Sequence, residues 1–204
     1  MLRLAIPKGR LEEEVNSYLE RAGYVFNEKT SIIYRSQELV GFLVRPFDVP
    51  TYLLQGAADI GFCGTDVLVE TGVELLQPFY LPSELSKMVF AGPEDKEIPS
   101  GEVSIATKFP HITQRFCESK GWKCRIVTLK GSVELAPIVG LADFIVDITQ
   151  TGRTLRENRL KVLEEILLIR LHVVLNPVSY RTKRAEIMNF LERLKRGIDD
   201  VKVS

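Results

Sequence analysis

The sequence predicts an α/β protein built as two lobes of mixed, largely parallel sheet with flanking helices. Short apolar, β-rich runs alternate with helical stretches, which is the pattern of parallel strands joined by crossover helices. A charged, turn-rich stretch at residues 92–101 separates two such runs. A long β-branched run at residues 162–174 then leads to an amphipathic C-terminal segment, which indicates that the chain returns to the first lobe.

The individual elements follow from hydrophobic periodicity. In the first helix, apolar side chains recur at helical spacing from Leu11 to Ala22, and Gly23 is a plausible terminator. Strands are expected at residues 2–6, 39–44, 59–63, 75–81, 88–91, 103–107, 124–129, 144–148 and 162–174. Further helices are expected at residues 50–55, 66–70, 111–120 and 133–139, near Leu155, and at residues 179–201.

The lobe boundaries follow from where the terminal helix can pack. The first α/β run offers it the larger sheet, so the second lobe is expected as an insertion into the first. We expect residues 1–91 and 170–204 to form the first lobe and residues 92–169 the second. Ligands of such folds bind in the crevice at the carboxyl ends of the strands.

Composition excludes several classes of protein. The 27 basic and 27 acidic residues balance, which disfavours general nucleic-acid binding. No apolar run approaches the roughly 18 residues needed to span a bilayer, and the start does not read as a signal peptide. Three cysteines without a C-x-x-C pair suggest neither a disulfide framework nor a zinc site, and two histidines are too few for a metal cluster. We therefore expect a soluble, reduced, cytoplasmic protein.

The strongest functional signal lies at residues 144–155. An apolar strand ends in Asp147, and a turn of threonines and glycine leads into the next helix. Free backbone N–H groups, hydroxyls and a glycine permitting close approach together suit a phosphate, and Asp147 is placed to accept hydrogen bonds from sugar hydroxyls. An ordinary helix cap is the alternative.

Other strand ends carry candidates for binding an anionic ligand, each with a structural alternative. The basic turn after the first strand could also be a solvated loop, and Arg45 could pair with a surface acid. Asp66 could be a helix cap, and Cys63 is better explained as a small buried residue than as a nucleophile. The candidates are Lys8, Gly9, Arg10, Arg45, Gly64, Thr65 and Asp66.

Taken in order, these segments resemble the ATP phosphoribosyltransferase family of histidine biosynthesis over nearly the whole chain. The resemblance is strongest from Gly131-Ser132-Val133-Glu134 through Gly140-Leu141-Ala142-Asp143 to Asp147 and Thr151-Gly152-Arg153-Thr154-Leu155. The opening residues 6–11, the Arg45-Pro46 turn and residues 58–61 match the family in the same order. Such an ordered set is far more specific than any single motif.

The resemblance implies a fold like the type II periplasmic binding proteins, with the active site between the lobes. It implies that residues 149–154 hold the ribose 5′-phosphate and Asp147 the ribose hydroxyls, while Lys8, Arg10 and Arg45 face the nucleotide or pyrophosphate. The implied phosphoribosyl pyrophosphate site comprises Glu134, Asp147, Thr149, Gln150, Thr151, Gly152, Arg153 and Thr154.

The resemblance also implies the reaction and its partners. Adenine N1 of ATP would attack the sugar C1′ as pyrophosphate leaves, with Mg²⁺ bound mainly through substrate phosphates. The chain ends soon after its terminal helix, as in the short form, so we expect a homodimer associated with a regulatory subunit that resembles histidyl-tRNA synthetase. Two alternatives remain: a phosphoribosyltransferase acting on a free base, and a non-catalytic binding protein of the same architecture.

Overall fold

The computed structural model describes residues 1–98 and 101–202, and these divide into two compact α/β units. Of the described residues, unit 1 comprises 1–68, 73–83 and 170–202, and unit 2 comprises 69–72, 84–98 and 101–169. We had expected the first lobe to extend to residue 91. The chain instead passes into unit 2 within one continuous strand, β6 (Leu76–Pro93), where we had predicted two strands, at residues 75–81 and 88–91.

Three parallel strands form the centre of unit 1: β4 (Leu39–Val44), β1 (Leu2–Pro7) and β5 (Ile60–Gly64). The long strand β10 (Leu160–Leu175) returns antiparallel to β5. A short hairpin of β2 (Glu28–Lys29) and β3 (Ile33–Arg35) extends the sheet beside β4. The hairpin was not predicted, because β2 has only two residues and both are exposed.

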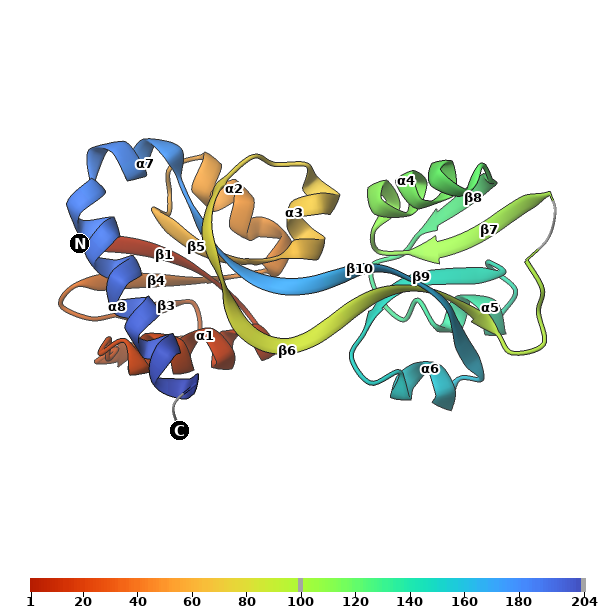
Figure 1. Ribbon diagram of the computed structural model, residues 1–204, viewed down its shortest axis with the longest axis horizontal. Helices are drawn as coiled ribbons and strands as arrows, with labels where there is room; N and C mark the ends of the chain where they lie inside the picture. The colour runs from red at the N-terminus through yellow and green to blue at the C-terminus, as the bar shows by residue number, and fades with distance from the viewer. Residues whose placement is uncertain (99–100, 203–204) are drawn as a thin grey trace. The chain divides into compact units, whose positions relative to one another are not determined.

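Alternation along β1 gives unit 1 a core on each face of its sheet. Leu4 and Ile6 pack with side chains of α1 (Arg10–Arg21) and α8 (Arg184–Lys202), whereas Ala5 packs with α2 (Val49–Leu54) and α3 (Thr65–Thr71). This is the two-sided covering expected of parallel strands joined by helices. Figure 1 shows α1 and α8 together in this unit.

Unit 2 repeats the arrangement with three parallel strands, β8 (Lys123–Thr128), β7 (Glu102–Thr107) and β9 (Phe144–Thr149), and with β6 antiparallel to β9. Phe90 packs on the face covered by α4 (Pro110–Lys120), and its neighbours Val89 and Ala91 pack on the other face. That second face is covered by α5 (Leu135–Ile138) and α6 (Arg153–Glu157).

The single C-terminal helix predicted at residues 179–201 is two helices, α7 (Pro177–Thr182) and α8. The Asn176 side chain accepts a hydrogen bond from the Ser179 backbone and so starts α7. Lys183 leaves the helical conformation with φ of −122°, which ends α7. The amphipathic pattern continues across the break, and therefore periodicity alone could not reveal it.

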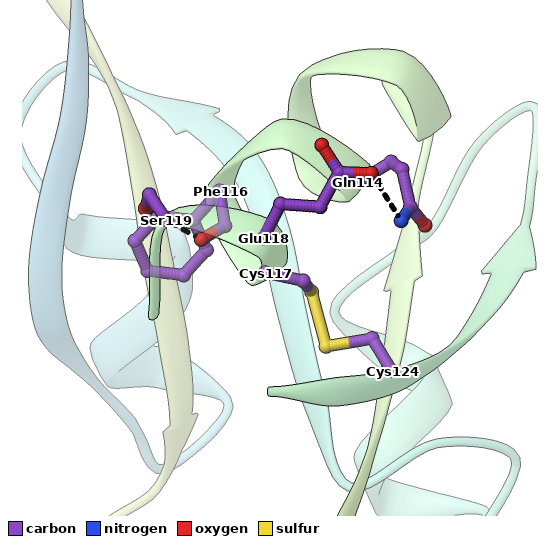
Figure 2. Close-up of a disulfide and its surroundings, with 6 residues drawn as sticks. All are labelled: Gln114, Phe116, Cys117, Glu118, Ser119 and Cys124. Atoms are coloured by element: carbon purple, nitrogen blue, oxygen red, sulfur yellow. Dashed lines mark hydrogen bonds between the residues drawn. A yellow bond between two sulfur atoms is a disulfide. The ribbon is translucent and has the colours of Figure 1, made fainter. Parts of the chain in front are cut away.

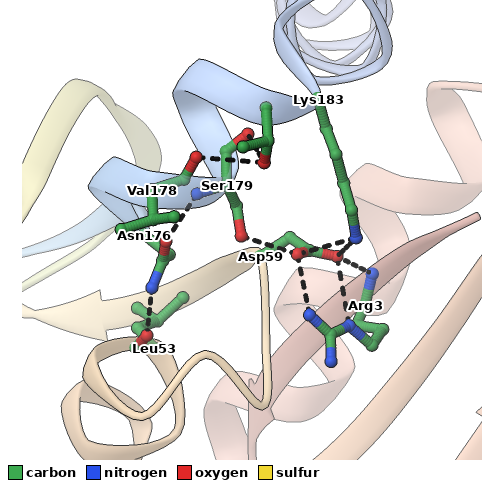
Figure 3. A network of polar contacts seen from close by, with 8 residues as sticks. Arg3, Leu53, Asp59, Asn176, Val178, Ser179 and Lys183 are labelled. Atoms are coloured by element: carbon green, nitrogen blue, oxygen red, sulfur yellow. Dashed lines mark hydrogen bonds and ion pairs between the residues drawn. The ribbon is translucent and has the colours of Figure 1, made fainter.

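The break at Lys183 accompanies a buried ion cluster around Asp59 (Figure 3). The Asp59 carboxylate is fully buried and accepts hydrogen bonds from the side chains of Arg3, Ser179 and Lys183 at 2.7–3.3 Å. Burial raises the pKa of Asp59, but these hydrogen bonds outweigh it and lower the pKa to about 2. The cluster joins β1, the start of β5 and the C-terminal helices.

A disulfide joins Cys117 in α4 to Cys124 in β8, with the Cα atoms 6.3 Å apart (Figure 2). Our expectation of a chain without disulfides was therefore wrong. Gly121 adopts a left-handed conformation with φ of +67° and reverses the chain at the end of α4, which sets the helix against the next strand. The seven-residue spacing of the cysteines does not reveal this proximity.

Replacing Asp59 tests how much the ion cluster contributes to the stability of the fold. We expect Asp59→Ala to lower the free energy of unfolding at pH 7 by about 3 kcal/mol, near the low end for breaking a buried ion pair. Arg3 and Lys183 are each about one-third exposed, so water can solvate them after the loss. Urea denaturation measures the difference, and Glu28→Gln, which removes only an exposed pair with Arg35, should change stability little.

The pH dependence of the free energy of unfolding tests whether the charge of Asp59 stabilises the fold. The pKa of Asp59 falls from 3.8 to about 2 on folding, so the carboxylate stabilises the fold above about pH 4 and loses this effect as the pH falls toward 2. The stability difference between the wild type and Asp59→Ala should shrink over that interval. A difference that stays constant from pH 7 to pH 2 would contradict the role of the charge.

Candidate functional site

The predicted phosphate turn lines a cavity of about 370 Å³ in unit 2. The turn connects β9 to α6, and a second wall comes from the loops before α4 and α5. Of the eight residues predicted to bind phosphoribosyl pyrophosphate, the cavity is lined by Glu134, Asp147, Thr149, Thr151, Arg153 and Thr154. Gln150 and Gly152 lie in the same turn but do not line it.

Two threonine hydroxyls shape the turn from within. The Gly152 N–H donates to Thr149 Oγ1 at 2.9 Å, and the Arg153 N–H donates to Thr151 Oγ1 at 3.4 Å. Gly152 has φ of +69°, a left-handed conformation that favours glycine. These contacts give the turn its form before any ligand binds.

The helix after the turn begins at Arg153, two residues before the predicted start, and has only five residues. Gly152 occupies the N-cap position of this helix. Thr154 lies inside the helix and is therefore not its N-cap. A single helical turn has little macrodipole. The turn therefore brings hydroxyls and side-chain charge to the cavity, with less of a helix dipole than the sequence indicated.

Asp147 is held at the inner end of the turn. Its Oδ1 accepts the Ile148 N–H at 2.9 Å, and its Oδ2 lies 3.9 Å from Lys108 Nζ. Burial raises the pKa of Asp147 and Glu134 raises it further, while the Ile148 N–H and Lys108 lower it. The carboxylate has oxygen capacity left to accept hydrogen bonds from hydroxyl groups.

Glu134 is the second acid of the cavity and comes from a different loop. It occupies the N-cap position of α5, and the backbone turns sharply just before it, where Ser132 has φ of +46°. A left-handed serine is uncommon and marks a turn fixed by its surroundings. Glu134 and Asp147 together bring two carboxylates to the cavity wall.

In unit 1, predicted ligand residues follow three adjacent parallel strands. Lys8 follows β1, Arg45 follows β4 and Thr65 follows β5, and the carboxyl ends of parallel strands share one edge of the sheet. Pro7 pairs with Val44, and the Lys8 N–H donates to the Val44 carbonyl at 2.8 Å, so Lys8 and Arg45 lie beside each other on this edge. Lys8, Gly9, Arg10 and Arg45 are exposed.

The turn after β5 makes mainly internal contacts. Thr65 Oγ1 accepts the Arg170 N–H at 2.9 Å and lies 3.0 Å from His172 Nε2. Asp66 accepts a backbone hydrogen bond from Val67 within α3, and burial raises its pKa. A Cβ on Gly64 would come within 2.1 Å of the Asp66 carboxylate, so a side chain at position 64 would displace that carboxylate. The Asp66 carboxylate thus bonds to backbone N–H groups in the first turn of α3, and Thr65 bonds to β10.

Cys63 and the histidines give no nucleophilic site in the described part of the chain. Cys63 is buried, and burial raises the pKa of its thiol, which keeps it protonated. Burial and the charge of Arg170 lower the pKa of His172. Among residues 1–98 and 101–202, no cluster of three or more His, Cys, Asp or Glu side chains could hold a metal ion.

Sequence reasoning missed Lys108, which lines the cavity from the turn between β7 and α4. A signal was present, because residues 103–107 and 111–120 were predicted as strand and helix, and Lys108 is the cation between them. It is the same strand–turn–helix position that singled out Lys8.

Within the described residues, no helix is long and apolar enough to cross a membrane.

Comparison with known proteins shows a family relationship over almost the whole chain. The profile of the ATP phosphoribosyltransferase family matches residues 45–196. An ATP phosphoribosyltransferase from Thermotoga petrophila is 63% identical over 199 residues, covering 98% of this chain and 96% of that protein.

Solved structures agree with the sequence match. A chain of the ATP phosphoribosyl transferase (HisG:HisZ) complex from Thermotoga maritima superimposes with a TM-score of 0.92 at 62% identity, covering 98% of this chain and all of that one. The periplasmic aliphatic sulphonate binding protein SsuA from Escherichia coli shares the fold alone, with a TM-score of 0.64 at 14% identity over 96% of this chain and 72% of its own. The predicted fold class is confirmed, and the chain belongs to the ATP phosphoribosyltransferase family.

Proposed function

We propose that this protein transfers the phosphoribosyl group of phosphoribosyl pyrophosphate to N1 of the adenine of ATP, giving phosphoribosyl-ATP and pyrophosphate. This reaction is the first step of histidine biosynthesis. The observation that carries the proposal is that the family relationship and the cavity of unit 2 meet at the same residues. The turn that resembles the family signature is the turn that lines the cavity, with Asp147 at one end and Thr154 at the other.

The phosphoribosyl group is assigned to unit 2. Thr151 and Thr154 offer hydroxyl groups to the three oxygens of the 5′-phosphate. Asp147 and Glu134 accept hydrogen bonds from the ribose hydroxyls. The carboxylates thus meet the neutral part of the substrate, while the hydroxyls of the turn meet its charged end.

ATP and the leaving pyrophosphate are assigned to the basic edge of unit 1. Lys8, Arg10 and Arg45 are exposed there, and Lys8 and Arg45 follow neighbouring strands. Point charges of this kind suit phosphate chains. Gly9 has φ of +92°, and no atom lies within 4 Å of the place that a Cβ would occupy, which leaves room for a ligand to approach the backbone.

The chemistry needs no protein nucleophile. The lone pair of adenine N1 forms the new bond to C1′ as the bond from C1′ to the pyrophosphate oxygen breaks, and the bonding electrons leave with pyrophosphate. The protein's part is to hold the two substrates in line and to stabilise the charge that develops on the leaving group. Burial keeps the Cys63 thiol protonated, which agrees with this role.

Mg²⁺ is proposed as the metal, held mainly by substrate phosphates. Mg²⁺ usually keeps one or two carboxylate ligands together with substrate oxygens, and Asp147 and Glu134 supply two carboxylates in the cavity without forming an all-protein site. When bound, the ion would offset negative charge on the leaving pyrophosphate.

A substrate test separates the proposed function from its two alternatives. The protein, with Mg²⁺ and phosphoribosyl pyrophosphate, should release pyrophosphate when ATP is added and not when free adenine is added. Release with adenine would instead indicate a phosphoribosyltransferase for free bases. Binding of substrates without any release, with or without a regulatory partner, would indicate a binding protein.

Thr154→Ala tests the phosphate turn. Loss of one hydrogen bond to a charged group weakens binding by about 10-fold to 100-fold, so the affinity for phosphoribosyl pyrophosphate should fall by that factor. Affinity for ATP should hardly change, because ATP is assigned to unit 1. The melting temperature should also hold, since Thr154 is not the N-cap of α6. Isothermal titration and thermal denaturation measure these quantities.

Thr51→Ala is the matched control, because Thr51 is an exposed threonine in the first turn of α2. It should leave both affinities unchanged. If Thr154→Ala lowers the melting temperature and keeps its affinity for phosphoribosyl pyrophosphate, the turn does not bind the phosphate.

A regulatory partner is part of the proposal. The similar Thermotoga maritima chain was solved in a complex of two kinds of subunit, and this chain covers all of it. We propose that this protein forms a homodimer within such a hetero-oligomer, that its partner resembles histidyl-tRNA synthetase, and that the assembly works in the cytoplasm.

If a separate subunit carries the regulation, inhibition of the enzyme by histidine should depend on that subunit. The purified chain alone should be insensitive to histidine, and inhibition should appear when the regulatory subunit is added. Light scattering should show the accompanying rise in mass. Inhibition of the isolated chain by micromolar histidine would contradict a separate regulatory subunit.

A further inference from the structure

We propose that Lys108 is a substrate-binding residue of the phosphoribosyl site, where its ammonium group binds a phosphate of phosphoribosyl pyrophosphate. This inference rests on the proposed function and adds a residue to it. Lys108 lines the cavity of unit 2 together with Asp147 and Thr154, but comes from the neighbouring strand end, after β7.

The charge of the cavity is the first argument. Asp147 and Glu134 line it with two carboxylates, and the substrate assigned to it is a polyanion. Like charges this close repel, so bound phosphate needs a cation nearby. The cations among the lining residues are Lys108 and Arg153.

Arg153 is less suited to this task than Lys108. The side chain of Arg153 is 80% exposed, and its Nε donates to Glu157 Oε1 at 2.7 Å, which engages the guanidinium along the outside of α6. The side chain of Lys108 is 34% exposed, and its Nζ lies 3.9 Å from Asp147 Oδ2. That distance is too long for a hydrogen bond, so a ligand can draw the ammonium group to itself without breaking one.

The backbone beneath Lys108 is fixed. Thr107 Oγ1 accepts the Phe109 N–H at 2.9 Å, and the Phe109 ring is buried in the core. The Glu70 carboxylate accepts the N–H groups of His111 and Ile112, each at 2.9 Å, and so caps the start of α4. These contacts hold the backbone of the turn in place, so the charged side chain of Lys108 extends from a fixed position at the cavity wall, as a binding residue requires.

The competing explanation is that Lys108 only offsets the charge of Asp147. In that case its loss would affect the empty protein as much as the complex and would show mainly in stability. A phosphate-binding role predicts a loss confined to ligands that carry a phosphate in this cavity. The two explanations therefore differ in which quantity changes.

Lys108→Gln tests the proposal, with Lys108→Arg as the charge-preserving variant. For Lys108→Gln we expect KM for phosphoribosyl pyrophosphate to rise about 10-fold to 100-fold, while KM for ATP and the melting temperature stay near the wild-type values. Lys108→Arg should recover most of the affinity. Lys123→Gln is the control, because Lys123 is an exposed lysine of the same unit at the opposite end of the parallel strands, and it should behave as wild type.

Equilibrium binding of ribose 5-phosphate and of inorganic pyrophosphate, each with Mg²⁺, identifies the phosphate involved. Weaker binding of either ligand to Lys108→Gln supports the proposal, and the ligand affected names the phosphate group. Unchanged affinity for both ligands, or an unchanged KM for phosphoribosyl pyrophosphate, would overturn it. These binding measurements stand even if the wild type fails to turn over ATP, so failure of the proposed function would be seen separately.

Discussion

The buried carboxylate of Asp59 is the constraint on which unit 1 depends. It lies where β5 begins, and it binds Arg3 on β1 and Lys183 at the junction of the C-terminal helices. A charge without water must be paired, so the first strand, a middle strand and the end of the chain are held together. The opposite ends of β1 and β5 carry Lys8 and Thr65, so the same cluster fixes the strands that present the basic edge.

The two units use one arrangement for different purposes. In each, three parallel strands bring their carboxyl ends to one edge of the sheet. A long strand then pairs antiparallel with the last of them, β10 with β5 and β6 with β9. Unit 1 places exposed cations at that edge, whereas unit 2 places hydroxyls, two carboxylates and Lys108 around a cavity. The chemistry proposed here needs both kinds of surface, because one substrate brings a sugar and both bring phosphate chains.

Much of the fold could be predicted because burial sets hydrophobic patterns. Residues 39–44 were predicted as a strand and β4 has those bounds, and the strand at 144–148 differs from β9 by one residue. The continuity of β6 could not be predicted, because polar and turn-forming residues interrupt its apolar pattern between Leu81 and Met88. The disulfide between Cys117 and Cys124 depends on a left-handed glycine turn, and the helix break at Lys183 accompanies a tertiary ion pair. None of these leaves a periodic signal.

The site was predictable where chemistry and local structure coincide. Six of the residues expected to bind phosphoribosyl pyrophosphate meet at one cavity, because five lie between the end of β9 and the start of α6, and Glu134 lies at the start of α5. Sequence alone could not separate phosphate binding from helix capping for the threonines of this turn, since the same residue types perform both tasks. In the structure Gly152 is the N-cap of α6, and Thr154 lines the cavity. Lys108 was missed although it shares the strand–turn–helix position of Lys8, because a single basic residue in a turn is usually a solvated surface residue.

In the proposed function, unit 2 binds the phosphoribosyl group through the turn from Asp147 to Thr154. Hydrogen exchange of the whole protein, with and without phosphoribosyl pyrophosphate and Mg²⁺, tests it most directly. The ligand should slow exchange of the backbone amides at residues 148–155, which include the Gly152 and Arg153 N–H groups. Protection confined to unit 1, with unchanged exchange at residues 148–155, would contradict it.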